Sequence, residues 1–412
     1  MIDQHLVQKT CARLTLQYGS HLCHRDCHGW TDGPEPPKHV VQDLTIVAIL
    51  IELWRGLYGV KPALEKEQST NQLQGAAASS SKEVPGCFSF VDVACGNGVV
   101  VYVLLMEGYD GFGIDACGRR AWSTYPQRVQ DRLRKAIYVP KPFVDAMSGV
   151  DVTTNSLDLG IEVVTCTSMF SMNTFIISNH ADELTVWTPL MATLANPVSP
   201  LPFLAIPCCS HSLTGAPYWY PPPSRKPIGL DDATRGSPPQ KKDEETNKQA
   251  EENENEELER NPQPASGDLK KLRASKMAAM AAQIDLAVPS PSRYACLTAK
   301  TVSISEELGY SIHTSQVQLP SLRNTVIVGV RRQQSSLSSS SKEVSPRDEG
   351  ESLSDTALAI VQRECEREGG IEEAAKIWIE RVKEFHMKNH NSAGGSGNEM
   401  ASMGLRRRDI EV

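Results

Sequence analysis

The sequence predicts an α/β fold whose sheet is mostly parallel. Three observations support this: short apolar segments at 88–93, 112–115 and 174–178 alternate with stretches of helical periodicity, a glycine turn follows the first of them, and the 412 residues are 40% hydrophobic. Short buried strands separated by helices are typical of a parallel sheet covered on both faces. Because single cores stop growing at roughly 250–300 residues, we expect one core with disordered inserts.

The other elements follow from periodicity. Residues 44–54 are apolar at helical spacing, too short to cross a bilayer and interrupted by Glu52, so they predict an amphipathic core helix and no membrane partner. The remaining predicted elements are a helix after 98, a helix from about 182, a strand at 202–207, a helix at 292–308, strands at 310–315 and 325–330, and helices at 355–368 and 371–386.

Low-complexity stretches interrupt the predicted core. Residues 241–260 carry nine acids and four bases, which accounts for −5 of the net charge of −8, so the rest of the chain neither favours nor excludes nucleic acid. The predicted segments are 1–37 (N-terminal, unassigned), 38–219 (first part of the core), 220–291 (acidic, Pro-rich insert), 292–332 (last part of the core), 333–352 (Ser-rich linker), 353–388 (helical tail) and 389–412 (disordered).

The first strand runs into a turn suited to a nucleotide-like cofactor. Residues 90–98 read Phe-Val-Asp-Val-Ala-Cys-Gly-Asn-Gly, and glycine at 96 and 98 lets the backbone bend sharply and approach a ligand. A dinucleotide site would carry a third glycine where this chain has Val101. The acid within the strand, Asp92, and the spacing that follows it resemble the pattern of class I methyltransferases, in which the acid supports the loop and the methionine end of the cofactor.

A second acid stands at the end of the next strand. Asp115 follows Gly98 by seventeen residues, close to the spacing at which an acid binds ribose hydroxyls. The alternative is a glycine turn in an unrelated α/β protein, with Asp115 capping the next helix. Strand, loop, helix, strand and acid in this order favour the functional interpretation. The expected cofactor-binding residues are Asp92, Cys95, Gly96, Asn97, Gly98 and Asp115.

Further blocks resemble one family within that class. Residues 113–115 with 119–122, the block 178–187 that contains Asn-His-Ala-Asp-Glu-Leu, and the block 204–209 that ends in Pro-Cys-Cys are similar to the signature blocks of the tRNA(Ser) (uridine-44-2′-O)-methyltransferases. Flanking similarity lies at 38–54 and 319–324. The resemblance covers a little over half of the chain. It implies a Rossmann-like sheet, mostly parallel with an antiparallel last strand, and S-adenosylmethionine-dependent methylation of a uridine ribose in serine tRNA.

The resemblance is imperfect at three places. The family usually has glycine at Ser178, more arginine at 116–118 and proline at Val186. These departures affect substrate details more than the fold. The family often has a longer N-terminal region, so an incomplete chain is a further expectation.

The block at 179–183 is the predicted catalytic site. It follows a strand, so it should lie at the carboxyl edge of the sheet, where ligands bind in open α/β folds. The reaction needs a group that removes the hydroxyl proton. Asp182 and His180 are the candidates, with Asn179 orienting the ribose and Glu183 second. The alternative for Asp182 is a helix cap, and the two interpretations are evenly balanced.

A basic stretch after the second strand predicts contact with RNA. Residues 119–141 carry seven bases and one acid, interleaved with Trp122, Tyr125 and Tyr138. Bases neutralise phosphates and aromatic rings stack on unpaired nucleotides, although a solvated helix face is the alternative. The predicted RNA-binding residues are Arg119, Arg120, Trp122, Arg128 and, separately, Arg323.

The cysteines predict a reducing, cytoplasmic environment. Eleven of them occur without a regular framework. The segment 21–28 holds histidines and cysteines, but its spacing matches no zinc module, and Cys208 and Cys209 are interpreted as core or pocket lining. No metal site is expected, and any accessory protein is unknown.

Two other functions stay open. The cofactor loop cannot by itself exclude another acceptor, such as a protein or a small molecule. A non-catalytic RNA-binding subunit is the second alternative. Retention of the glycines and of both acids argues against it.

Overall fold

The computed structural model describes residues 3–22, 38–63, 65, 88–147, 162–222, 291–319, 321–331 and 346–392. All of them belong to one unit, formed by Met1–Pro223 and Pro291–Val412. Most of the predicted acidic insert and Ser-rich linker, the tail end beyond residue 392 and positions 23–28 of the N-terminal His/Cys segment lie outside the described residues.

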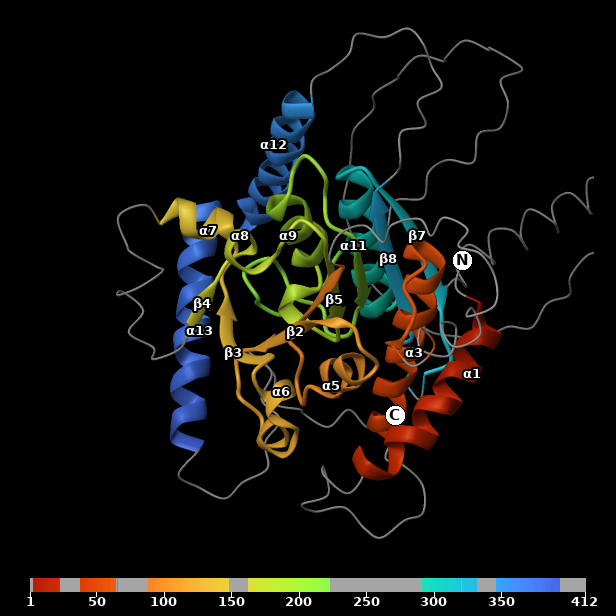
Figure 1. Ribbon diagram of the computed structural model, residues 1–412. Helices are drawn as coiled ribbons and strands as arrows, with labels where there is room; N and C mark the ends of the chain where they lie inside the picture. Colours follow the sequence, from red (N-terminus) through yellow and green to blue (C-terminus); the bar gives the residue numbers. More distant parts are fainter. Residues whose placement is uncertain are drawn as a thin grey trace, which may run out of the picture. The chain divides into compact units, whose positions relative to one another are not determined.

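The described residues form an eight-stranded sheet in the order β4-β3-β2-β1-β5-β6-β8-β7 (Figure 1). The pairs from β4 to β6 are all parallel, whereas β8 runs antiparallel to β6 and to β7. The predicted parallel sheet with an antiparallel last strand is therefore confirmed. The strands are β1 Ser89–Val93, β2 Asp110–Asp115, β3 Leu133–Tyr138, β4 Glu162–Val164, β5 Thr174–Asn179, β6 Phe203–Ile206, β7 Tyr310–Gln316 and β8 Thr325–Arg331.

Strands β3 and β4 were not predicted. In β3, the adjacent residues Arg134 and Lys135 are both exposed, which breaks the alternation expected of a strand. The strand is nevertheless held by its register with β2, in which Arg134 pairs with Ile114. Strand β4 has only three residues. A segment that short carries too little periodicity to be recognised from the sequence.

Side chains alternate between the two faces of the sheet and separate two apolar layers. Val91 and Ile176 face one layer, whereas Phe90 and Phe175 face the other. Figure 1 shows α1 and α3 side by side, away from α12 and α13. The helices of the Phe90 layer are α1 Gln4–Leu14, η1 Thr15–Gly19, α3 Lys38–Tyr58, α5 Val99–Met106, η2 Arg120–Thr124 and α6 Gln127–Gln130. The helices of the Val91 layer are α7 Lys141–Ala146, α8 Cys166–Met169, η3 Asp182–Leu184, α9 Trp187–Ala195, α11 Arg293–Glu307, α12 Pro346–Cys365, η4 Glu366–Glu368 and α13 Ile371–Ser392.

Helix α3 is buried on nearly all sides rather than along one stripe. Every residue from Leu44 to Ile51 is buried. The predicted helix is correct, but its amphipathic character is not, because α1 covers the side that would otherwise face water. No helix among the described residues is long and apolar enough to span a bilayer.

A buried ion pair fixes the N-terminal helix to the sheet layer. Glu107, which follows α5, accepts hydrogen bonds from Arg13 at 2.7 and 3.0 Å and from the Tyr18 hydroxyl at 2.9 Å. Its side chain is completely buried, whereas that of Arg13 is 37% exposed. Burial with satisfied hydrogen bonds is the condition under which such a charge is tolerated inside a protein.

The tail helices α12 and α13 pack on the opposite layer. Trp378 of α13 contacts Phe143 of α7 and Trp187 of α9, with ring centroids 6.1 and 6.5 Å apart. Ile360 and Val361 of α12 are fully buried in the same cluster. The predicted helix pair is confirmed, and it covers one face of the sheet next to the catalytic block described below.

Candidate active site at the carboxyl edge of the sheet

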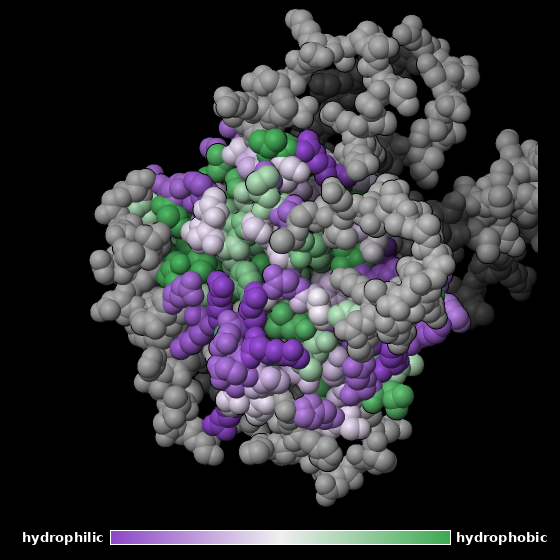
Figure 2. Space-filling view, in the orientation of Figure 1, coloured by the Kyte–Doolittle hydropathy of each residue, from purple (hydrophilic) through white to green (hydrophobic). Residues whose placement is uncertain are grey.

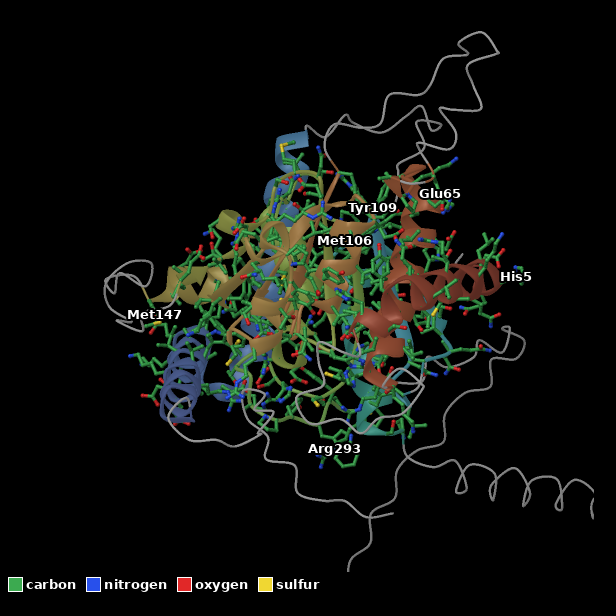
Figure 3. The ribbon with its side chains drawn as sticks, turned by 60° about the horizontal axis from the view of Figure 1, so that its bottom comes forward. His5, Glu65, Met106, Tyr109, Met147 and Arg293 are labelled. Atoms are coloured by element: carbon green, nitrogen blue, oxygen red, sulfur yellow. The ribbon has the colours of Figure 1, made fainter. Side chains whose placement is uncertain are left out.

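The two ends of the parallel strands can be followed in Figure 3. Met106 and Tyr109, at the end of α5, lie on the opposite side of the view from Arg293, which begins α11. Because α5 starts at the carboxyl end of β1 and runs back past the sheet, Met106 marks the amino edge. The predicted cofactor loop and catalytic block both follow strand ends at the other edge, after β1 and β5, which pair directly.

The loop between β1 and α5 is a tight left-handed turn. Ala94, Gly96 and Gly98 have φ angles of 60°, 56° and 75°. A Cβ on Gly98 would lie 2.9 Å from a side-chain carbon of Leu133, so this position has no room for a larger residue. A Cβ on Gly96 would meet nothing within 4 Å. The space beside Gly96 is thus open, as a ligand that approaches the backbone requires.

Three side chains hold this loop from outside. The Gly96 N–H donates to Asp115 Oδ2 at 2.9 Å, and the Gly96 carbonyl accepts from the Trp122 indole N–H at 2.9 Å. The Tyr125 hydroxyl donates to the Asn97 carbonyl at 3.0 Å. The support by Trp122 and Tyr125 was not predicted, because a contact between a loop and a segment 26 residues later leaves no local pattern.

Asp92 lies beneath the loop with unused hydrogen-bonding capacity. It is 2% exposed, and its Oδ1 has no partner among the described residues. Burial raises the pKa of Asp92 well above its ordinary value, and the charges of Asp43 and Asp115 act in the same direction. A buried carboxyl group without a partner is rare in a folded protein. It fits a site that receives a positively charged ligand.

Asp115 is placed as predicted at the end of β2, but its oxygens already bind the protein. Besides Gly96, the Cys117 N–H donates to its Oδ1 at 2.9 Å, and Arg119 lies 3.5 Å from the same atom. Each carboxylate oxygen accepts two hydrogen bonds. Asp115 therefore supports the loop and keeps acceptor capacity for a ribose hydroxyl.

The second block follows β5 and has a strained backbone. His180 and Asp182 have φ angles of 52° and 43°, and with Ala94 they are the described non-glycine residues with positive φ. Such conformations cost on the order of 1–3 kcal/mol each and cluster at functional sites. The Asn179 Oδ1 in this block is buried without a partner in the described part of the chain. The strain and the unpaired atom mark the carboxyl edge of β5 as a site.

A helix remote in sequence orients His180. The Gln42 amide nitrogen, on α3, lies 2.7 Å from His180 Nε2. An amide nitrogen only donates, so as placed it requires an unprotonated Nε2. Burial lowers the pKa of His180 below its ordinary 6.5; the Arg323 charge acts in the same direction and that of Asp182 opposes it. His180 is thus a neutral imidazole at pH 7. The sequence reasoning missed both Gln42 and its neighbour Asp43.

The two acids of the block have different surroundings. Asp182 Oδ1 accepts from the Cys208 thiol at 2.9 Å. Glu183 is 7% exposed, and burial raises its pKa to about 8, while the Arg381 guanidinium 3.8 Å away opposes this rise. At 3.8 Å that charge offsets only part of the cost of burial. Glu183 is therefore largely protonated at neutral pH.

The predicted RNA-binding residues are distributed over two places. Arg120 and Arg128 are exposed, and Arg119 is half-buried beside Asp115. Figure 2 shows hydrophilic side chains gathered over β2, β3 and α6, the elements that contain or adjoin them. Arg323, also exposed, instead donates to Cys209 Sγ at 3.4 Å and thus lies beside the second block.

The aromatic residues expected to stack on nucleotides are differently placed. Tyr125 and Tyr138 are 3% and 4% exposed and belong to the apolar layers. Trp122 binds the cofactor loop through its indole nitrogen. The interpretation that these rings interleave with the bases on the surface was therefore wrong for both tyrosines, because their apolar area is buried against the sheet.

Comparison with known proteins agrees with this geometry. A family described as predicted AdoMet-dependent methyltransferase matches residues 72–140. A tRNA (uracil-O(2)-)-methyltransferase of Aspergillus oryzae is 47% identical over 395 residues, which are 94% of this chain and 55% of that protein. The chain is thus similar over nearly its whole length to a tRNA (uracil-O(2)-)-methyltransferase. Proteins of the same name from Schizosaccharomyces pombe and Neurospora crassa are 38% and 37% identical, over 55% of this chain and 39% of their own lengths.

The similarity to these relatives extends beyond the cofactor loop. The chain spans about half the length of the Aspergillus relative and about two-fifths of the other two. The match to the Aspergillus protein takes in nearly the whole chain, so it includes the catalytic block and the closing strands of the sheet. The resemblance to tRNA uracil-2′-O-methyltransferases that the sequence blocks predicted is thereby confirmed, while serine tRNA and uridine 44 stay predictions.

Proposed function

We propose that this chain catalyses S-adenosylmethionine-dependent methylation of the ribose 2′-hydroxyl of a uridine in tRNA. The observation that carries the proposal is the position of the loop 94–98 and the block 179–183 at the carboxyl ends of the paired strands β1 and β5. A cofactor in the loop would then face an acceptor bound at the block. The names of the three relatives indicate that the acceptor is a uridine in tRNA.

The loop residues fit S-adenosylmethionine. The cofactor supplies an electrophilic methyl group on a sulfonium ion, and its amino-acid end carries an ammonium group. Asp92 offers a buried oxygen without a partner for that positive end, and the open space beside Gly96 admits a ligand against the backbone. Asp115 retains acceptor capacity for the ribose. Cys95 and Asn97 complete the turn that holds these groups.

His180 is our first choice as proton acceptor, and Asp182 is the alternative. A neutral imidazole can take the proton that leaves the 2′-oxygen as that oxygen bonds to the methyl carbon. Because the Nε2 lone pair accepts from the Gln42 amide in this arrangement, that amide must first turn to present its oxygen to an Nε2–H, which leaves the Nδ1 lone pair free to take the proton. Asn179, whose Oδ1 is unpaired, can accept from a ribose hydroxyl. Glu183, largely protonated, would add little charge to the block.

RNA would reach the site across two basic areas. Arg119 and Arg120 border the cofactor loop and Arg323 borders the catalytic block, whereas Arg128 lies toward the amino edge, where it donates to Met106 Sδ at 2.8 Å. Cations flanking a groove bind phosphates without reading sequence. We infer that Trp122 acts on RNA only indirectly, through the loop. Serine tRNA, uridine 44 and a cytoplasmic location are part of the proposal, as family expectations.

The decisive experiment is methyl transfer from labelled S-adenosylmethionine to unmodified serine tRNA, with nucleoside mapping of the product. We expect 2′-O-methyluridine with the wild type, and no product with Gly96→Arg, which fills the open space beside the loop. A non-serine tRNA is the matched control for substrate choice.

The other outcomes separate the alternatives. Equal transfer to the non-serine tRNA would remove the serine specificity and leave the enzyme class intact. Cofactor binding without transfer to any tRNA would favour another acceptor or a missing partner. Absence of cofactor binding would overturn the enzymatic proposal and favour a non-catalytic RNA-binding subunit.

A further inference from the structure

Two thiols and a carboxylate converge behind the catalytic block. One ligand atom from each of Asp182, Cys208 and Cys209 lies within 4.8 Å of the other two. Cys208 is buried and the other two are half-buried. All three side chains therefore point into one small space, although Asp182 comes from a different strand connection than the cysteines.

The sheet brings these residues together. Strands β5 and β6 pair in parallel, with Asn179 opposite Ile206, so the segments that leave their carboxyl ends start side by side. The His180 N–H donates to the Ile206 carbonyl at 3.1 Å and continues this pairing beyond the strands. Asp182 then turns back through its positive φ, which directs it toward Cys208. The positive φ of Asp182 thus brings its carboxylate next to the thiols.

The ligand types suit a thiophilic divalent cation. Zinc binds thiolate sulfur at about 2.3 Å and carboxylate oxygen at about 2.0–2.2 Å, with tetrahedral geometry. Ligand atoms around such an ion are roughly 3.5 Å apart, which lies inside the observed 4.8 Å limit. The 2.9 Å hydrogen bond from Cys208 to Asp182 would be replaced when the thiol loses its proton to the metal-bound state.

We propose that Asp182, Cys208 and Cys209 form a binding site for a cation of the Zn²⁺ class. Three protein ligands leave a fourth position for water or another oxygen, the arrangement of zinc sites that are not purely structural. The proposal does not rest on methyl transfer. If both hold, Asp182 is a metal ligand and His180 is the proton acceptor of the block.

The Arg323 guanidinium lies where it would compete with this cation for Cys209. Its guanidinium donates to Cys209 Sγ at 3.4 Å, on an exposed side chain that can turn into solvent. A bound metal ion would displace it, because two cations would otherwise share one sulfur. Removing this competing charge should therefore strengthen metal binding, and Arg323→Gln should bind Zn²⁺ more tightly than the wild type does.

His211 is the nearest histidine of the same run. It is 1% exposed, and neither ring nitrogen has a hydrogen-bond partner of standard geometry in the described part of the chain. A backbone bridge to Pro217 fixes its position. Its ring does not join the three ligand atoms as placed, so it would have to turn to become a fourth ligand. His211→Asn tests that separately.

The test is metal binding to the full chain, measured by Zn²⁺ titration and by visible absorption with Co²⁺ as the probe. We expect thiolate-to-cobalt absorption in the wild type, lost in Cys208→Ser and in Cys209→Ser. Asp182→Asn should weaken Zn²⁺ binding more than about 100-fold, since even residues that only orient a ligand are worth 10–100-fold. Cys11→Ser is the matched control, because this half-buried thiol lies on α1 and contacts Thr45 at 3.3 Å.

The N-terminal His/Cys segment needs its own control. A chain with Cys23→Ser and Cys27→Ser should keep the cobalt absorption. The proposal would be overturned if the Cys23→Ser, Cys27→Ser variant lost the cobalt absorption while the Cys208→Ser and Cys209→Ser variants kept it. Equal Zn²⁺ affinity in the wild type and in Asp182→Asn would also overturn it. If a cysteine variant fails to fold, as judged by its melting curve, Asp182→Asn and Arg323→Gln still decide, because they must change affinity in opposite directions.

Discussion

Two buried carboxyl groups of this chain, Glu107 and Asp92, have opposite surroundings. Their residues are 1% and 2% exposed. Glu107 receives hydrogen bonds from Arg13 and Tyr18, whereas Asp92 Oδ1 has no partner among the described residues. A buried polar group that the protein itself satisfies contributes to the fold, and one that it leaves unsatisfied is reserved for something else. The contrast thus distinguishes a carboxyl group that stabilises the fold from one that lies at the candidate site.

The same contrast extends to the backbone. Around Glu107 the chain continues from a regular helix, whereas Ala94, His180 and Asp182 adopt positive φ at the carboxyl edge. Strain and unpaired polar atoms occur together there. Substitutions at the edge should therefore change catalysis with little effect on stability, and substitutions at Glu107 should do the reverse.

The largest effect is expected from His180→Gln. The amide keeps the size and polarity of the ring but is a very poor proton acceptor, so kcat should fall about 10²–10⁴-fold. The pKa of His180 is lowered, so the wild-type rate should fall only below pH 6.5, as the ring becomes protonated. The pH profile of methyl transfer checks this. An unchanged acidic limb in the variant would assign the proton transfer to another group.

Next in size is Glu107→Gln, which removes a buried charge from a satisfied ion pair. The free energy of unfolding should fall by about 2 kcal/mol, because the hydrogen bonds from Arg13 and Tyr18 lose their charged acceptor while Arg13, 37% exposed, stays partly hydrated. Denaturant titration measures this. Glu65→Gln is the matched control, since the Glu65 side chain is 37% exposed and its pair with Arg55 should contribute less than about 1 kcal/mol. Equal losses in both variants would contradict the role of burial.

Gly98→Ala should weaken cofactor binding by about 30-fold. An added Cβ would lie 2.9 Å from Leu133 at a φ of 75°, and strain of this kind costs on the order of 2 kcal/mol. Calorimetric titration with S-adenosylmethionine checks it. The control is Gly118→Ala, where the Cβ would lie 3.9 Å from the nearest side chain. If both variants bind alike, the shape of the loop does not determine affinity.

Glu183→Gln should stabilise the chain at alkaline pH. The pKa of Glu183 is raised to about 8 from an ordinary 4.5, so between these values the folded chain binds more protons than the unfolded chain. Stability therefore falls as pH rises from 4.5 to 8. The variant lacks this loss and should be more stable above pH 8 by at least about 2 kcal/mol, since each unit of raised pKa corresponds to roughly 1.4 kcal/mol. Melting curves of the wild type and the variant at pH 5 and pH 8.5 test this. If the stability difference between the two proteins is the same at both pH values, ionisation of Glu183 is not its cause.

The smallest effect is expected from Arg128→Ala. Loss of one phosphate contact should weaken tRNA binding uniformly across sequences and reduce the slope of affinity against salt by about 1. Fluorescence anisotropy at several salt concentrations measures the slope. Arg363→Ala, at an exposed pair with Glu307 on the tail side, is the matched control. A slope that falls equally in both variants would mean that binding follows total charge alone.

Local patterns predicted the fold and the cofactor loop, and long-range contacts set the limit. The turn 94–98 was readable because strand, glycines and helix are contiguous. Gln42 was not, because it lies 138 residues from His180. Strand β3 was missed since Arg134 and Lys135 stand together at exposed positions. Each failure has the same cause: the partner that decides the conformation is absent from the window of sequence around the residue.

The sequence predicted which residues stand at the candidate site, but not how each one is buried or hydrogen-bonded. The sequence placed acids at 92, 115, 182 and 183, but it could not tell that Asp115 closes the loop while Asp92 stays unpaired. Burial and charge neighbours decide this, and both are properties of packing. The roles of these acids in the reaction stay predictions.

The 3.8 Å contact between Arg381 and Glu183 joins the tail helix to the block 179–183 across 198 positions of the chain. During synthesis, strands β1 to β8 leave the ribosome before α13 does. The loop that holds the cofactor can therefore form early, whereas Glu183 gains its guanidinium neighbour only when the tail has been made. The order of translation thus makes the surroundings of Glu183 the last part of this edge to be completed.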